Sequence, residues 1–121
     1  MVYGRSKSEV ALIDISDDAS NSTSVNVDNM LLAGIVFPSA MTGSNITFDF
    51  SVDGSSWVDV VETDGTEVSY TVSAGNATRV DPSGWAFASG GYLRITSDGT
   101  EAADRKIKLI FRFFCTCNNF F

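Results

Sequence analysis

The chain has 121 residues, of which 44% are hydrophobic, and it carries a formal net charge of −7. This length suits a single domain over residues 1–121, which is large enough to bury a core without disulfides or metal ions. With nine phenylalanines and only two prolines, the composition argues against an intrinsically disordered chain. The net acidity argues against nucleic acid as a ligand.

The sequence contains no recognisable membrane or secretion segment. The longest apolar run, Leu31 to Phe37, is too short to span a bilayer. The first sixteen residues lack the apolar stretch of a signal peptide. We therefore expect a protein that is made in the cytoplasm and does not bind membranes.

Short strands separated by turn residues are predicted along the whole chain, because no helical spacing of apolar residues is sustained. In chain order, the predicted strands are Glu9–Ile15, Val25–Val27, Asn29–Phe37, Ile46–Val52, Val58–Val61, Thr66–Val72, Tyr92–Thr96 and Arg105–Cys115. The irregular segment Asp81–Ser89 is expected to form one helical turn or a crossover. About eight strands at this spacing predict an all-β fold, an antiparallel β-sandwich or jelly roll.

The last predicted strand separates an apolar face from a basic face. Its alternating residues are Ile107, Leu109, Phe111 and Phe113 on one face, and Lys106, Lys108 and Arg112 on the other. Residues 105–121 carry four bases and no acid, whereas residues 1–104 carry fifteen acids and four bases. Such asymmetry favours attraction between subunits. The alternative is that the basic end forms ion pairs within its own fold.

The C-terminal tail, Asn118–Phe121, ends in two phenylalanines and so would place aromatic surface at a chain end. We expect this surface to dock on a neighbouring subunit or on its own domain. Together, the basic strand and the tail form the candidate interface, which consists of Arg105, Lys106, Lys108, Arg112, Asn118, Asn119, Phe120 and Phe121.

Catalysis, cofactors and metal ions find little support in the sequence. The chain has no histidine, which excludes Ser-His-Asp and Cys-His catalytic arrangements. Asp14, Asp17 and Asp18 form an acidic cluster of the kind that calcium binds, but their spacing matches no EF-hand. Cys115 and Cys117 are expected to be free thiols, with an interchain disulfide as the alternative. We therefore expect a protein that is not an enzyme and holds neither cofactor nor metal.

The stretch FDFSVDGSSWVDV, Phe48 to Val60, predicts a hairpin around a tryptophan. A three-residue turn at Gly54–Ser56 would turn Trp57 away from the core face. A two-residue turn at Asp53–Gly54 would place Trp57 opposite Phe50. We expect a buried or half-buried tryptophan, and the two registers leave its direction open.

This hairpin resembles a unit of the discoidin-like, galactose-binding jelly rolls. The matching residues are Ser51, Asp53, Gly54 and Trp57 in a turn of the type S-x-D-G-x-x-W. GYLRITS (Gly91–Ser97) and KIKLIFRF (Lys106–Phe113) are similar to later strands of that family, so the resemblance covers residues 45–114. It implies the fold, and it implies that Trp57 belongs to the scaffold.

The chain as a whole resembles the small virion proteins of tailed bacteriophages, which include capsid decoration (cement) proteins and fibre modules. The shared features are a short, acidic, all-β chain rich in Ser, Thr, Gly and Phe. This resemblance implies a virion protein, assembled in the host cytoplasm, with the major capsid protein and copies of itself as partners in a trimer or dimer.

Two functions are carried forward. The first is a non-enzymatic capsid decoration protein that binds and stabilises the shell. The alternative is a carbohydrate- or receptor-binding module of a phage fibre, for which Trp85 in the segment DPSGWAFAS is the candidate exposed aromatic residue.

Overall fold

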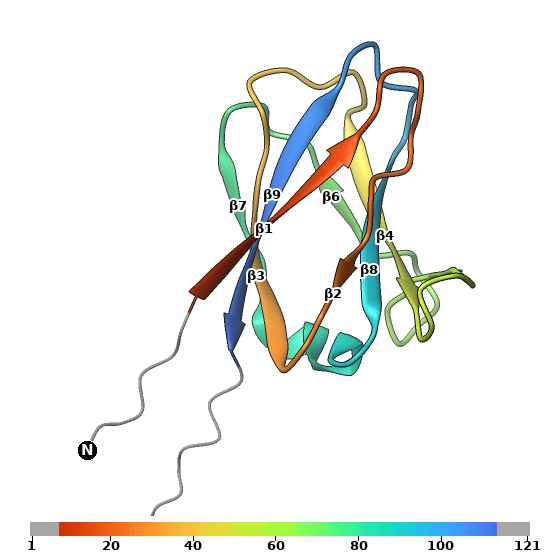
Figure 1. The fold of residues 1–121 in the computed structure, drawn as a ribbon, viewed down its shortest axis with the longest axis vertical. Coiled ribbons are helices and arrows are strands. Elements are labelled where there is room, and N and C mark those ends of the chain that lie inside the picture. The colour runs from red at the N-terminus through yellow and green to blue at the C-terminus, as the bar shows by residue number, and fades with distance from the viewer. Residues whose placement is uncertain (1–7, 114–121) are drawn as a thin grey trace, which may run out of the picture.

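The computed structural model describes residues 8–113, which form two antiparallel β-sheets packed face to face (Figure 1). The four-stranded sheet contains, in spatial order, β1 (Ser8–Ile15), β9 (Arg105–Phe113), β3 (Met30–Val36) and β7 (Ala77–Arg79). The five-stranded sheet contains β2 (Val25–Asn26), β8 (Tyr92–Ser97), β4 (Asn45–Ser51) and β5 (Val58–Asp59), and β6 (Ser69–Thr71) also pairs with β4. The predicted all-β sandwich is therefore confirmed.

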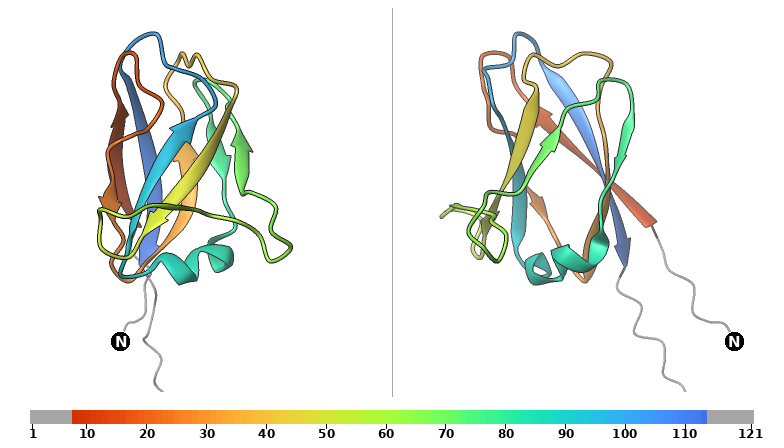
Figure 2. Two further views of the ribbon diagram at one scale, coloured as in Figure 1. Left: turned by 90° about the vertical axis from the view of Figure 1, so that its right-hand side faces the viewer. Right: turned by 180° about the vertical axis from the view of Figure 1, so that it is seen from behind.

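The chain crosses repeatedly between the two sheets, as in a double-sheet jelly roll. Each predicted strand segment contains a strand, although the strand ends differ by several residues. The sequence does not predict β7, because its three residues, Ala-Thr-Arg, show no apolar alternation. The irregular segment Asp81–Ser89 contains a 3-10 helix, η1 (Pro82–Ala88), which lies across one end of the sandwich (Figures 1 and 2).

The core lies between the sheets and is built from alternate residues of the strands. On β9, the side chains of Ile107, Leu109 and Phe111 are fully buried, with 0% of each residue exposed. The lysines between them, Lys106 and Lys108, are exposed on the outer face. The predicted two-faced pattern of this strand is thus confirmed, because successive side chains of a strand point to opposite sides of the sheet.

The hairpin between β4 and β5 adopts neither of the two predicted registers. Phe50 pairs with Val58, so the connection is longer than a two- or three-residue turn. The side chains of Ser51, the last residue of β4, and of Asp53 close the connection by accepting hydrogen bonds from its backbone. The Ser51 hydroxyl accepts from Gly54 N at 2.8 Å, and Asp53 Oδ1 accepts from the amides of the two following serines. The backbone amides of the connection bond to these side chains and not to the facing strand. The loop is longer for this reason.

Trp57 is half-buried, as expected, and lies outside the core. Its ring covers the guanidinium of Arg94, whose Cζ is 4.5 Å from the ring centroid. Arg94 in turn donates to the buried carboxylate of Asp49 at 2.9 Å. Because Arg94 lies between the inward residues Leu93 and Ile95 on β8, this stack sits on the outer face of the five-stranded sheet. Trp57 therefore belongs to the scaffold and shields an ion pair.

The substitution Phe48→Ala tests the aromatic part of the core. Phe48 is 0% exposed, and its ring centroid lies 4.8 Å from that of Trp85 and 5.9 Å from that of Tyr70. Truncation leaves a cavity, so we expect the free energy of unfolding, measured by urea denaturation, to fall by about 3–5 kcal/mol. Phe87→Ala is the control at a residue that is 51% exposed, and it should cost clearly less. Equal losses would contradict this placement of Phe48.

Candidate protein-binding surfaces

Three of the four basic interface candidates lie together on the outer face of the four-stranded sheet. Lys106, Lys108 and Arg112 occupy alternate positions of β9 and are all exposed. Arg105 is the exception. The side chain of Arg105 turns inward at the end of the sandwich, and only 16% of that side chain is exposed.

The outer face of β1 and β9 combines lysines with exposed apolar side chains. The register pairs Leu12 with Lys108, and Val10 lies two residues before Leu12 on the same face. Val10 is 57% exposed and Leu12 is 53% exposed. Lys106 donates to Asp14 at 3.2 Å, whereas Lys108 makes no ion pair with any described residue. We call Val10, Leu12, Lys106 and Lys108 the basic ridge.

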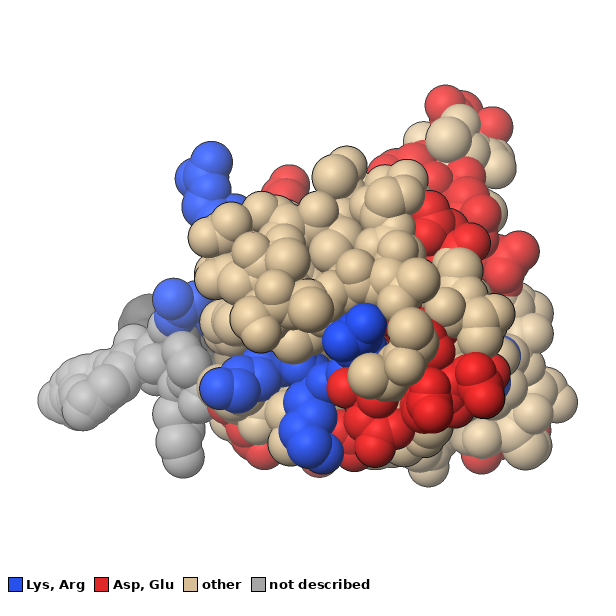
Figure 3. Space-filling view, turned by 90° about the horizontal axis from the view of Figure 1, so that it is seen from above, with Lys and Arg blue, Asp and Glu red and all other residues tan. Residues whose placement is uncertain are grey.

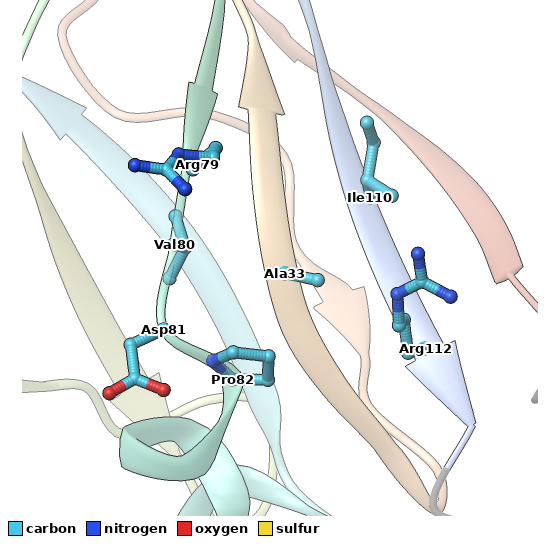
Figure 4. Close-up of a pocket in the computed structure, with 7 residues that line it drawn as sticks. All are labelled: Ala33, Arg79, Val80, Asp81, Pro82, Ile110 and Arg112. Carbon is cyan, nitrogen blue, oxygen red and sulfur yellow. The ribbon is translucent and has the colours of Figure 1, made fainter.

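A groove lies on the outer face of the same sheet, over β9, β3 and β7, whereas the basic ridge lies over β1 and β9. It has a volume of about 680 Å³ and is lined by Ala33, Arg79, Val80, Asp81, Pro82, Ile110 and Arg112 (Figure 4). We call it the arginine groove. β3 runs through its middle, and the short side chain of Ala33 leaves the sheet face hollow there. Arg79 and Arg112 stand on the two strands that flank β3 (Figure 4).

Acidic residues gather on the other sheet. Between Ser51 and Thr78 the chain carries five acids and no base. Seen from above, acidic side chains occupy mainly one side of the molecule and reach a protruding part, while cationic side chains lie mainly on the other side (Figure 3). The segment between β5 and β6 projects from the body of the sandwich (Figure 2). We call its outermost residues, Glu62–Glu67, the acidic tip.

The acidic tip is a closed turn rather than a loose loop. The amide of Glu62 donates to the Thr66 carbonyl at 2.7 Å, and the amide of Gly65 donates back to the Glu62 carbonyl at 2.9 Å. Gly65 has φ = +89°, a left-handed conformation that glycine adopts without strain. The Thr66 amide donates to Asp64 Oδ1, and this bond holds the pKa of Asp64 below its ordinary value. The tip therefore presents its three carboxylates on a defined backbone.

Arg105 is engaged in a buried network around Glu101. The Glu101 side chain has no exposed surface (0%) and accepts four hydrogen bonds. Oε1 accepts from Thr42 N at 2.8 Å and from Arg105 Nε at 2.9 Å. Oε2 accepts from Gly43 N at 2.9 Å and from the Ser97 hydroxyl at 2.7 Å. The alternative that the basic end forms ion pairs within its own fold thus holds for Arg105, and also for Lys106, which pairs with Asp14.

This network fixes the charge state of Glu101. Burial is the largest single influence and acts to raise its pKa, but the hydrogen bonds from Thr42, Gly43, Ser97 and Arg105 together outweigh it and lower the pKa to about 2. Gly43 is required at this point, because a Cβ there would overlap the Ser97 hydroxyl. The role of Glu101 is structural, and no sequence pattern signals it.

Trp85 does not offer an exposed ring. The expectation of an exposed aromatic platform at this residue is wrong, because Trp85 is only 4% exposed. Its indole N–H donates to the Tyr70 hydroxyl at 3.3 Å, and its ring packs edge-on against Phe48. Phe87, two residues later in η1, is exposed instead. A second groove of about 430 Å³ passes beside these residues, lined by Val60, Val61, Glu62, Thr63, Val68, Tyr70, Asp81, Gly84, Trp85 and Phe87.

The remaining candidates lie outside the described residues. These are the tail residues Asn118, Asn119, Phe120 and Phe121, together with Cys115 and Cys117. Within residues 8–113, no group of three or more potential ligands is placed to hold a metal ion. None of the helices described in this range has the length and apolar character needed to cross a membrane.

A scan against protein-family models finds no match, and neither a search of the curated proteins nor a search of the solved structures returns a similar protein. The resemblances to galactose-binding jelly rolls and to phage virion proteins therefore stay expectations. The β-sandwich itself is supported by the strand pairing described above.

The substitution Glu101→Gln tests the buried network. An amide places a donor where the carboxylate accepts, so we expect the variant to lose about 2–4 kcal/mol of unfolding free energy at neutral pH. The pKa of Glu101 is lowered from 4.5 to about 2 in the folded protein. Its contribution is therefore complete above about pH 4.5 and is lost as the pH falls toward 2.

Urea denaturation of both proteins between neutral pH and pH 2 measures this effect. The difference between wild type and Glu101→Gln should shrink by an amount on the order of 3 kcal/mol across the acidic range. Glu9→Gln, at an exposed carboxylate outside the network, is the control substitution. A difference that is constant with pH would exclude a charged Glu101 in the fold.

Proposed function

We propose that this protein is a non-enzymatic structural component of a bacteriophage virion, a capsid decoration (cement) protein that binds and stabilises the shell. It acts by binding and not by chemistry. The observation that carries the proposal is the basic ridge, an exposed apolar strip on β1 beside the lysines of β9.

The composition of the basic ridge supports a protein partner. The outer face of an antiparallel sheet is normally polar where it meets water. Here β1 instead exposes Val10 and Leu12, while its inward residues Ile13 and Ile15 are fully buried. Apolar side chains that remain exposed next to one another are typical of interaction sites. The neighbouring lysines favour a partner surface that is acidic around an apolar centre.

The position of the ridge supports attachment to an assembly. β1 and β9 pair along eight residues, from Ser8 opposite Arg112 to Ile15 opposite Arg105. The ridge is therefore held by the longest strand pairing in the described chain. A rigid surface loses little conformational entropy on binding. A protein that binds only the assembled shell stabilises the shell by mass action. The major capsid protein and further copies of this chain are the proposed partners, and the proposed location is the virion.

The fibre-module alternative is retained because of the second groove. Phe87 is 51% exposed beside that groove, and the carboxylates of Glu62 and Asp81 line it. An exposed aromatic ring beside hydrogen-bonding carboxylates suits a sugar. Phe87 thus replaces Trp85 as the ligand candidate under this reading.

The substitution Leu12→Glu tests the basic ridge. It removes an exposed apolar contact and places an acid beside Lys108, so affinity for capsids of the phage that encodes the chain should fall at least about tenfold. Co-sedimentation with purified capsids measures the affinity. Val52→Glu is the matched control, because Val52 is 77% exposed on the other sheet's hairpin. A wild-type chain that fails to bind the capsids would refute the decoration function.

Glycan binding separates the two functions. A decoration protein should show no binding on a glycan array. Binding that is present in the wild type and lost in Phe87→Ala would favour the fibre module instead. Unfolding measurements on Phe87→Ala show whether such a loss reflects the ring or the fold.

A further inference from the structure

The arginine groove presents cations that form no ion pair with any residue among 8–113. The ion pairs among residues 8–113 join Arg94 to Asp49, Arg105 to Glu101 and Lys106 to Asp14. Arg79 and Arg112 take part in none of them, and both are exposed. Between them lies an apolar floor that includes Ala33 and Ile110 (Figure 4). This arrangement suits a narrow acidic segment, because a guanidinium binds a carboxylate through two parallel hydrogen bonds.

The acidic tip presents the complementary charge on a protrusion. Glu62, Asp64 and Glu67 lie within six residues, all exposed, and none of the three forms an ion pair with a described residue. Val61, at the base of the tip, is 51% exposed and adds an apolar contact. The turn is closed by its own backbone hydrogen bonds, so little further ordering is needed on binding.

Groove and tip belong to opposite sheets of the sandwich. The groove opens on the outer face of the four-stranded sheet, whereas the tip extends from the β5–β6 connection beside the five-stranded sheet. No ion pair joins them within one copy over the described residues. Over the described residues, each copy therefore carries one acidic protrusion and one basic recess that form no ion pair with each other.

We propose that the acidic tip of one copy docks in the arginine groove of a second copy of this chain. The inference deepens the proposed function and rests on it, because it supplies the contact between neighbouring copies on the shell. Contacts of this kind either exchange reciprocally in a dimer or continue around a closed ring, and both arrangements fill every groove. The basic ridge stays free for the shell in either case.

The contact is expected to be weak in free solution. A single turn inserted into a groove buries less area than the roughly 1,200–2,000 Å² of a stable interface. Its charge-assisted hydrogen bonds are screened by salt, since they lie near the surface. On a shell, the local concentration of neighbouring copies reaches the millimolar range, and the same weak contact then closes. Decoration of the shell is therefore cooperative.

Charge reversal on each side tests the contact. The tip variant is Glu62→Lys with Glu67→Lys, and the groove variant is Arg79→Glu with Arg112→Glu. All four side chains are exposed, so both variants should fold. The control variant, Glu9→Lys with Asp28→Lys, changes the net charge of the chain as much as the tip variant does, at exposed acids elsewhere. Circular dichroism and urea denaturation check the fold of each.

Sedimentation velocity without shells measures self-association over a range of protein concentrations. Wild type and control should associate with a dissociation constant of about 0.1 mM at roughly 50 mM salt, and more weakly at roughly 500 mM. The tip variant and the groove variant should each associate at least about tenfold more weakly when alone. An equal mixture of the two should regain the association, because each tip then meets a groove of opposite charge.

Three outcomes would overturn the proposal: a wild type that stays monomeric up to about 1 mM at low salt, a tip variant that associates like wild type, or a mixture that regains nothing. The shell-binding assay is independent of this measurement. Leu12→Glu should self-associate like wild type while losing capsid affinity. A failure of the tip–groove contact is therefore distinguishable from a failure of the decoration function.

Discussion

The buried carboxylate of Glu101 is the constraint on which the proposed binding surfaces depend. It joins the connection before β4, the end of β8 and the first residue of β9 through hydrogen bonds to Thr42, Gly43, Ser97 and Arg105. With Arg105 held inward, the following residues of β9 alternate outward and inward from a fixed start. A slip of one residue would bury the lysines and expose the core face. The Glu101–Arg105 ion pair at the end of the sandwich therefore supports the register that places the lysines of β9 on its outer face.

The net charge of −7 conceals an uneven distribution of charge over the surface. The outer face of the four-stranded sheet carries three cations without described partners, Arg79, Lys108 and Arg112, while the acids concentrate beside the five-stranded sheet. The two sheets thus present fields of opposite sign across one small domain. Exposed apolar residues accompany both charged regions. Val10 and Leu12 lie beside the lysines, and Val61 lies beside the acids.

Local alternation made most of the fold predictable, and contacts between distant residues account for what was missed. The two faces of β9 follow from its sequence alone, since a strand has a period of two. Arg105 does not join the predicted interface, because it pairs with the buried Glu101. Glu101 lies in a loop, where no sequence periodicity could have predicted its burial. Trp85 is buried because Phe48 and Tyr70 meet it from other parts of the chain. The arginine groove needs β7, whose three residues carry no apolar periodicity.

The acidic tip contributes no side chain to the core, and this freedom has an evolutionary consequence. All six of its residues are exposed, and the hydrogen bonds that close it stay within the turn. Changes of sequence or length at such a site leave the stability of the domain nearly untouched. The tip can therefore change in sequence without loss of the fold, and under the proposed tip–groove contact such changes would alter which copies recognise one another. It is also the natural place to display an inserted peptide on an otherwise unaltered scaffold.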